Sequence, residues 1–261
     1  MLQKVFGEEL WYQGLIAGFE TTPVWLFILF YFIIILAAYL FGSLNTAIVI
    51  SRFFYHEDIR TKGSGNAGMT NMMRTYGKGP AFATFFGDIL KTFLGLVVGT
   101  VLCGINGAYV AGLFSILGHV APIYYRFKGG KGVAASAMFV LYVNPLAFLV
   151  LLSIFVLLVW ALKFLSLGSI VSALVYPLLL YRMEDYFFDR PLRIIISLIA
   201  ALIVVYMHRS NMKRLLEGTE SKFSFKKTKK RPTADNGEKQ DGEAVDCAKE
   251  EADGDIHKKS K

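Results

Sequence analysis

The sequence predicts an all-α integral membrane protein with about seven transmembrane helices, an N-terminus outside the cell and a cytoplasmic C-terminus. Hydrophobic residues make up 54% of the 261 residues, and the mean hydropathy of +0.47 is well above that of soluble domains. The apolar residues are grouped in long runs, several of them near the roughly 20 residues that cross the hydrocarbon core of a bilayer. Most cations fall in the loops of one side, which sets the orientation.

The N-terminal part contains an amphipathic segment and the first span. Residues 1–22 mix charged and aromatic side chains and lack the apolar core of a signal peptide, so we expect an interfacial segment. The first span covers residues 24–50 and is interrupted by Gly42, Ser43 and Asn45. Small residues in a span favour close helix packing, although Ser43 and Asn45 could instead line a polar cavity.

The second span, residues 80–103, carries two charges. Asp88 and Lys91 are three residues apart, so they share one helix face and can pair. A salt bridge that fixes helix register and a functional pair both explain such charges in a membrane, and both interpretations stay open. A turn at residues 104–107 leads to a third span, residues 108–125.

The remaining spans begin with a broken apolar run. Residues 133–162 are interrupted by Asn144-Pro145, which favours two short re-entrant or hairpin helices over one span. Residues 166–181 and 191–207 supply two further spans, which brings the count to about seven.

Orientation follows from the short loops. Cations lie in residues 51–79, in residues 126–131 and at Lys163, whereas the turn at residues 182–190 carries both signs. The positive-inside rule therefore places these basic loops in the cytoplasm. We expect a multi-pass protein of the inner (plasma) membrane, with a membrane domain over residues 23–221.

The C-terminal tail, residues 222–261, differs in composition. A polybasic block at residues 226–231 suits anionic lipid headgroups. The acidic, aromatic-free sequence beyond it predicts disorder.

Composition and spacing exclude several classes of function. The net charge of +8 is better explained by cytoplasmic loops than by nucleic-acid binding, because no basic soluble domain is visible. Four scattered histidines predict no metal site, and we expect no cofactor. Cys103 and Cys247 form no disulfide framework, and no Ser-His-Asp or G-x-S-x-G signature is present.

The first cytoplasmic loop has the composition of a phosphate site. Glycines allow backbone N–H groups to face an anion, while hydroxyls and amides add neutral donors. The loop contains Gly63, Ser64, Gly65, Asn66, Gly68, Thr70 and Asn71, and Arg74 follows it. Its match to the dinucleotide fingerprint G-x-G-x-x-G is rejected, since no strand precedes it. A bare glycine turn is the simpler alternative, but it leaves the polar side chains unexplained.

Two further polar segments lie at the same membrane face. The second loop offers two ammonium groups and flexible backbone before a helix that starts near Val133, and it consists of Lys128, Gly129, Gly130, Lys131 and Gly132. It lacks the residues of a Walker loop, and an ordinary basic turn is the alternative. At the end of the last span, His208 and Asn211 share a helix face. An interfacial or dipole-pairing role for His208 is the alternative there.

Together these motifs resemble the acyl-phosphate-dependent glycerol-3-phosphate acyltransferases of bacterial membranes, the PlsY family. The resemblance covers about residues 35–223, and Ser166-Leu167-x-Ser169 also matches. Three long signatures occur in the family's order: Gly63-Ser64-Gly65-Asn66-x-Gly68-x-Thr70-Asn71 with Arg74; Gly118-His119-x-x-Pro122 with Phe127-Lys128-Gly129-Gly130-Lys131-Gly132-Val133-Ala134; and His208-Arg209-x-Asn211 with Arg214 and Gly218-Thr219-Glu220.

The resemblance implies acyl transfer from acyl phosphate to the sn-1 hydroxyl of glycerol 3-phosphate, which gives lysophosphatidic acid and inorganic phosphate. Ser64 and the loop N–H groups would bind a phosphate and the acyl carbonyl, and Arg74 and Lys131 would clamp phosphates. His208, Asn211 and Ser169 would orient the glycerol hydroxyls. The proton acceptor is either the substrate's own phosphate or His208. Membrane lipid is the expected surrounding, with a monomer expected and a homo-oligomer left open.

Two other classes of protein fit part of the pattern. An organic-phosphate transporter would also gather glycines and cations near helix breaks, but it would show internal repeats and a site at the bilayer midplane. A non-catalytic scaffold whose basic tail binds lipid would leave three polar loops unexplained.

Overall fold

The computed structural model describes residues 10, 13–15, 23–183 and 190–223. The chain divides into two units, residues 1–227 and 228–261, and the second lies wholly outside the described residues. Most of the predicted interfacial segment (1–22) and nearly all of the predicted disordered tail (222–261) also lie outside them.

The described part of the chain is helical and contains no strand, as the sequence predicts. The helices are α3 (Val24–Ser43), α4 (Thr46–Tyr55), α5 (Met69–Thr75), α6 (Lys78–Val120), α7 (Val133–Val143), α8 (Pro145–Leu162), α9 (Leu165–Met183), α10 (Arg190–Met207) and α11 (Arg209–Leu216). Short 3₁₀ turns lie at Ile59–Thr61 and Ile123–Tyr125.

Four segments of the described chain are long and apolar enough to cross a membrane: Val24–Tyr55, Lys78–Tyr125, Pro145–Leu162 and Leu165–Met183. A fifth is added if Pro191–Met207 and Arg209–Leu216, which meet at 55°, count as one broken span. Large apolar side chains on these helices point outward, and Trp160 on α8 is 73% exposed. Such outer faces suit contact with lipid.

Helix α6 is a hairpin of two helices. Cys103 and Gly104 have non-helical backbone angles, with φ of 59° and ψ of −150° at Gly104. A Cβ on Gly107 would overlap the carbonyl of Gly99, so the two halves pack at backbone distance. The chain therefore reverses direction near residues 103–104, at the start of the predicted 104–107 turn. Glycine permits both the turn and the close approach.

The predicted interruption of the first span is the boundary between α3 and α4. Asn45 caps α4, because its side-chain oxygen accepts a hydrogen bond from the Ile48 N–H at 3.2 Å. A Cβ on Gly42 would overlap the Ser115 carbonyl, and one on Gly118 would overlap the Tyr39 carbonyl. The interpretation of these small residues as close helix packing is thus confirmed.

The Asn144-Pro145 break is also confirmed. Helix α7 ends at Val143 and α8 begins at Pro145, the first helical position, where its missing N–H is not needed. The Asn144 side chain accepts a hydrogen bond from the Ala147 N–H at 2.9 Å and caps α8.

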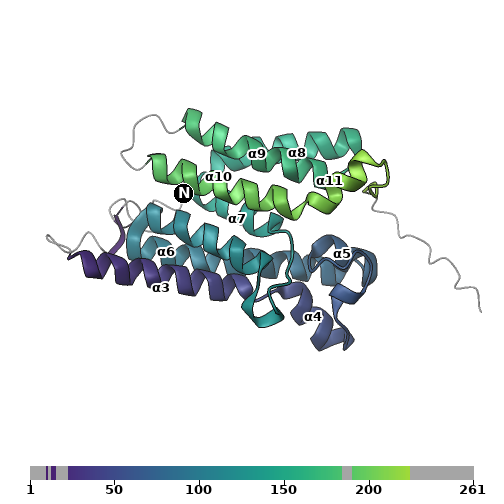
Figure 1. The fold of residues 1–261 in the computed structure, drawn as a ribbon, viewed down its shortest axis with the longest axis horizontal. Coiled ribbons are helices and arrows are strands. Elements are labelled where there is room, and N and C mark those ends of the chain that lie inside the picture. Colours follow the sequence, from purple (N-terminus) through teal and green to yellow (C-terminus); the bar gives the residue numbers. More distant parts are fainter. Residues whose placement is uncertain (1–9, 11–12, 16–22, 184–189, 224–261) are drawn as a thin grey trace, which may run out of the picture. The chain divides into compact units, whose positions relative to one another are not determined.

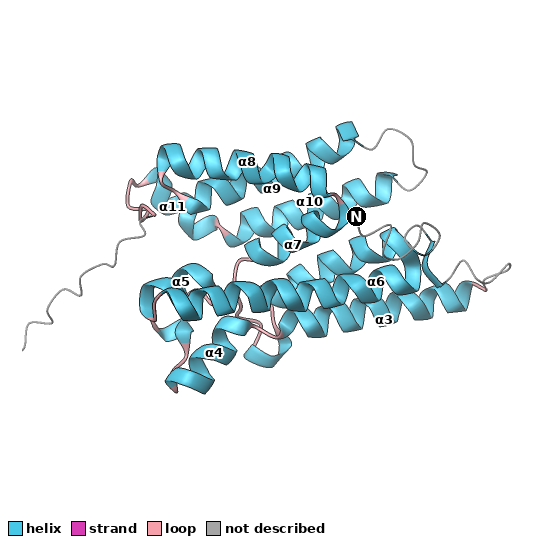
Figure 2. Ribbon diagram, turned by 180° about the vertical axis from the view of Figure 1, so that it is seen from behind, coloured by secondary structure: helices cyan, strands magenta, loops and turns pink. Residues whose placement is uncertain are grey.

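An aromatic core joins the helices. Tyr109 of α6 and Phe139 of α7 lie edge to face at 5.4 Å, and Phe139 meets Tyr176 of α9 at 6.2 Å. Helix α7 lies between the α3–α6 layer and the α8–α10 layer (Figures 1 and 2). Helices α4, α5 and α11 lie at one end of the bundle (Figure 1), so the three polar segments come to the same end.

Candidate active site

The first loop is folded around Asn71. This side chain is buried; its Oδ1 accepts a hydrogen bond from the Ser64 N–H at 2.9 Å, and its Nδ2 donates to the carbonyls of Ile59 and Lys62. Gly63 has a φ of 56°, and a Cβ there would overlap Asn71 Oδ1. Asn71 therefore shapes the loop from inside, whereas the sequence pattern suggested a direct substrate contact.

Three N–H groups of the first loop are satisfied internally. The Ser64 N–H donates to Asn71, the Gly65 N–H to the Lys62 carbonyl at 3.0 Å, and the Gly68 N–H to the Asn66 carbonyl at 3.1 Å. The loop as folded here offers the exposed hydroxyls of Ser64 and Thr70 rather than these amides.

Arg74 lies on α5, directly after this loop. Its side chain is exposed and makes no hydrogen bond or ion pair with any residue that the structure describes. A guanidinium without a protein partner keeps both of its parallel N–H donors for an anion. Arg74 is therefore available to bind an anion next to the first loop.

The second loop is held against the end of α6. The N–H groups of Gly129 and Gly130 donate to the carbonyls of Val120 and His119, both at 3.1 Å. A Cβ on Gly129 would overlap the His119 carbonyl, so only glycine fits. These two amides are therefore committed to the fold, and Gly132, with φ of 79°, turns the chain into α7.

Arg60 joins the two loops, and sequence reasoning counted it only as a loop cation. Its Nη1 donates to the carbonyls of Tyr125 at 2.8 Å and Lys128 at 3.1 Å, while its Nη2 pairs with Asp58 at 2.7 Å. The Arg60 guanidinium holds the pKa of Asp58 well below its ordinary value, against the effect of partial burial. The contacts of Arg60 with a loop about 65 residues away depend on tertiary folding, and no local pattern in the sequence indicates them.

A hydrogen-bond network connects the second and third segments. Lys131 Nζ donates to Asn211 Oδ1, and Asn211 Nδ2 donates to Glu220 Oε1 at 2.6 Å. Glu220 also accepts from Arg214 Nε at 2.7 Å and from Ser166 Oγ at 2.8 Å. Glu220 and Ser166 were part of the motifs without an assigned role, and the structure places both in the network.

Burial and neighbouring charges shift the pKa values of Lys131 and Glu220 in this network. Burial lowers the pKa of Lys131 to about 8; Glu220 opposes the shift, while the charges of Arg214 and Arg74 add to it. Partial burial raises the pKa of Glu220, but hydrogen bonds from Asn211, Ser166 and Arg214 outweigh it and leave the pKa below its ordinary value. Lys131 is thus a cation whose charge depends on pH near neutrality.

His208 lies between α10 and the polar helix α11, and its side chain is buried. Its Nδ1 is 2.8 Å from the Val204 carbonyl. A carbonyl only accepts, so Nδ1 carries the proton and Nε2 is the acceptor of the neutral ring. Burial is the main cause that lowers the His208 pKa, with Lys131 adding to the effect.

Ser169 is not joined to this network by its hydroxyl. Its Oγ donates to the Leu165 carbonyl in the preceding turn of α9 at 2.9 Å. Ser166, one turn earlier, is the α9 hydroxyl that contacts Glu220. Lys128 is exposed, and Asn66 is half-buried beside Gly68.

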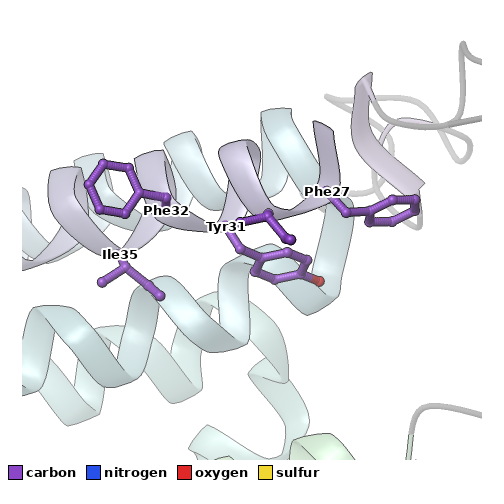
Figure 3. A pocket seen from close by; sticks show the side chains of 5 residues that line it. Phe27, Tyr31, Phe32 and Ile35 are labelled. Carbon is purple, nitrogen blue, oxygen red and sulfur yellow. The ribbon is translucent and has the colours of Figure 1, made fainter. Parts of the chain in front are cut away.

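An apolar hollow on α3 does not have the chemistry of the site. It is lined by Phe27, Ile28, Tyr31, Phe32 and Ile35 (Figure 3). Apart from the Tyr31 hydroxyl, these side chains offer nothing polar to a phosphate, and the hollow suits an apolar chain.

A family model and the similar proteins found by sequence carry the same description. The family model described as glycerol-3-phosphate acyltransferase matches residues 32–218. A glycerol-3-phosphate acyltransferase of Thermoanaerobacter sp. (strain X514) is 39% identical over 72% of this chain and 93% of its own. One of Clostridioides difficile (strain 630) is 39% identical over 76% of this chain and 97% of its own.

Two solved structures share the fold. A crystal structure of PlsY, an integral membrane glycerol 3-phosphate acyltransferase, in its glycerol 3-phosphate form has a TM-score of 0.69 and 32% identity, over 74% of this chain and 96% of its own. The lysophosphatidic acid form gives a TM-score of 0.67 and 30% identity, over 75% of this chain and 96% of its own.

Proposed function

This chain belongs to the glycerol-3-phosphate acyltransferase family of the PlsY type, and we propose that it transfers a fatty acyl group from acyl phosphate to the sn-1 hydroxyl of glycerol 3-phosphate. The products are lysophosphatidic acid and inorganic phosphate. The observation that carries the proposal is the Lys131–Asn211–Glu220 network, which joins two motifs at one end of the bundle near Arg74, a cation with no partner among the residues that the structure describes. The two PlsY structures, one with glycerol 3-phosphate and one with lysophosphatidic acid, support this substrate and this product.

The arrangement fits two substrates that both carry phosphate. Arg74 gives a bidentate donor pair and Lys131 a half-buried ammonium group, so the two cations bind phosphate oxygens in different ways. The Ser64 hydroxyl donates a neutral hydrogen bond to the acyl carbonyl, whose oxygen gains negative charge in the transition state.

The reaction needs little covalent chemistry from the protein. The glycerol hydroxyl oxygen bonds to the acyl carbon, and the bond from that carbon to the phosphate oxygen breaks. The hydroxyl proton passes to the departing phosphate, so the balance closes with ester and hydrogen phosphate. Acyl phosphate is already activated, and holding the two substrates together supplies much of the acceleration.

His208 orients the hydroxyl in this proposal. Its Nδ1 is fixed on the Val204 carbonyl, which leaves Nε2 to accept a hydrogen bond from the glycerol hydroxyl without taking its proton. Asn211, held between Lys131 and Glu220, fixes the ammonium group that clamps phosphate. The pH dependence of His208→Gln separates this role from the competing one, in which His208 is a general base.

The proposed topology has about seven crossing helices and a cytoplasmic site. The Cys103–Gly104 break divides Lys78–Tyr125 into two crossings, and α7 and α10 add two more to the long apolar helices. The cation-rich end with α4, α5 and α11 then faces the cytoplasm of a plasma-membrane protein, with the N-terminus outside. Single-cysteine labelling at Lys78 and Asn106 tests this, because Lys78 is expected to react only from the cytoplasm.

The experiment that tests the function is a donor assay. Purified protein is given glycerol 3-phosphate with acyl phosphate, acyl-CoA or acyl carrier protein, and lysophosphatidic acid and released phosphate are measured. We expect both products in equal amounts with acyl phosphate alone. If product forms only with acyl-CoA or acyl carrier protein, acyl phosphate is not the donor. If no donor gives product, the proposed acyl transfer is wrong.

A further inference from the structure

A buried polar cluster (Asp88, Lys91 and His119) lies within the α6 hairpin, and none of the steps above uses it. Asp88 Oδ1 is 2.9 Å from Lys91 Nζ and 3.5 Å from His119 Nδ1, and Lys91 Nζ is 3.0 Å from His119 Nδ1. The three residues are 2%, 5% and 3% exposed. Two opposite charges are thus buried in a membrane-spanning element, where burial is costly.

The cluster contacts the segment that holds the first loop. Lys91 Nζ donates to the Leu44 carbonyl at 2.9 Å, and Thr46 Oγ1 donates to Asp88 at 3.2 Å. Leu44 and Thr46 flank Asn45, whose side-chain amide donates to the Ala67 carbonyl of the first loop at 3.3 Å. The cluster therefore fixes the junction from which Asn45 reaches that loop.

The cluster contacts the second loop through His119. The His119 carbonyl accepts a hydrogen bond from the Gly130 N–H at 3.1 Å. A Cβ on Gly130 would overlap His119 Nε2 and would lie 2.7 Å from the Ala67 carbonyl. Gly130 thus lies between the His119 ring and the first loop. The imidazole that contacts Lys91 and Asp88 is therefore also packed against the glycine that adjoins the first loop.

Helix register alone does not account for the cluster. The two halves of α6 are already in register through close packing of small residues, since a Cβ on Gly95 would lie 2.7 Å from Ser115 Oγ and one on Gly99 would lie 2.9 Å from the Ala111 Cβ. Apolar side chains would hold the hairpin without the cost of buried charge. The contacts that apolar side chains could not replace are those to Leu44 and Thr46.

We propose that Asp88, Lys91 and His119 are positioning residues that set the separation of the first loop (63–71) from the second loop (126–132), and so the alignment of the two phosphate-bearing substrates. The inference rests on the proposed acyl transfer. Small misplacements of reacting groups reduce rate strongly, so the effect falls mainly on kcat.

The test compares single and double variants of the purified protein. Asp88→Asn leaves Lys91 without its charged partner, and we expect a lower Tm together with a lower kcat. The double variant Asp88→Asn/Lys91→Met removes both charges with little change in volume, so we expect its Tm to return toward that of the wild type. Its kcat should stay about tenfold or more below the wild type, with KM for glycerol 3-phosphate changed less. Ser115→Ala, a buried polar deletion in the same hairpin, is the matched control and should keep both kcat and KM.

The outcomes separate this inference from the proposed function. Recovery of both Tm and kcat in the double variant overturns the positioning role, because the pair is then only structural. Should the double variant not fold, Lys91→Arg decides, since it keeps the charge while moving the donor: normal kcat in a folded Lys91→Arg overturns the inference. An inactive wild type contradicts the proposed function instead.

Discussion

Lys131 and Asn211, 80 residues apart in the sequence, are joined by a hydrogen bond from the lysine Nζ to the asparagine Oδ1. The bond connects the loop before α7 to helix α11, and Glu220 accepts from the other side of the same amide. The ammonium group is therefore fixed by a chain of hydrogen bonds that ends on a carboxylate.

Asn211→Ala should reduce kcat/KM by about 10- to 100-fold, because Lys131 loses its acceptor and the Glu220 carboxylate loses a donor. Steady-state kinetics in detergent measures this. Lys213→Ala on the same helix is the control: that side chain is 77% exposed, and the one ion pair it forms within the described part of the chain is with Glu217 at 3.8 Å. If the two substitutions reduce kcat/KM equally, Asn211 has no specific role in the site.

The pH dependence of KM for the phosphate substrates should follow the charge of Lys131. Its pKa is lowered to about 8, so the phosphate clamp loses its charge as pH rises through that value. We expect KM for the phosphate substrates to rise above about pH 8, and Lys131→Arg, which stays charged, to flatten this rise. Lys128→Arg, on the exposed neighbour, should keep the wild-type profile. A wild-type KM that stays constant to about pH 9 contradicts the assignment.

The same pKa has a consequence for stability. Between about pH 8 and the ordinary lysine pKa near 10.5, the unfolded chain binds a proton at Lys131 that the folded chain does not. The contribution of this group to the free energy of unfolding therefore rises with pH across that window, while activity falls. Opposite slopes of Tm and kcat/KM, both weakened in Lys131→Arg, are the expected signature.

His208→Gln distinguishes the two proton acceptors. If His208 only orients the hydroxyl, the variant should lose about tenfold or less in kcat at every pH above about 7. If His208 is a general base, its loss should instead lower kcat by about 10²- to 10⁴-fold. The limb of the pH–rate profile that its titration produces should then also disappear. The measurement is kcat against pH for both proteins with saturating acyl phosphate.

Arg60→Ala should loosen both loops together. The substitution removes two hydrogen bonds to the carbonyls of Tyr125 and Lys128 and leaves Asp58 without its main partner. We expect a several-fold higher KM for glycerol 3-phosphate and a loss of about 1–2 kcal/mol in the free energy of unfolding. Arg52→Ala is the control, since Arg52 is 54% exposed and also pairs with Asp58, but it contacts Tyr125 only over the ring, at 5.6 Å, and not through the backbone carbonyl that Arg60 binds. If Arg52→Ala has the same effect, the loop-joining role of Arg60 is wrong.

Local features of the fold were predictable from the sequence. The helix break at Asn144-Pro145 and the turn near Gly104 follow from residues that act on their own backbone. The motifs also marked segments that the structure brings into contact with one another. These signals are short-range, and the physical cause lies within a few residues of the effect.

The role of each residue within a motif was not predictable from the sequence. Asn71 faces inward because it satisfies three backbone groups of its own loop, which no pattern of letters shows. Ser166 rather than Ser169 reaches Glu220, because the direction of α9 depends on packing. The contact of His119 with Lys91 needs the α6 hairpin to close, and it joins residues 28 apart. Such roles depend on tertiary geometry.

We propose that acyl transfer takes place at a site that includes Ser64 and Arg74. The most direct measurement is the rate of lysophosphatidic acid formation from acyl phosphate and glycerol 3-phosphate by purified wild type, Ser64→Ala and Arg74→Ala. Arg126→Ala, an exposed cation of the second loop, serves as control. We expect each site variant to lose about 10²-fold or more in kcat/KM while the control keeps its rate. Full rates in both Ser64→Ala and Arg74→Ala, or no product from the wild type, would contradict the account.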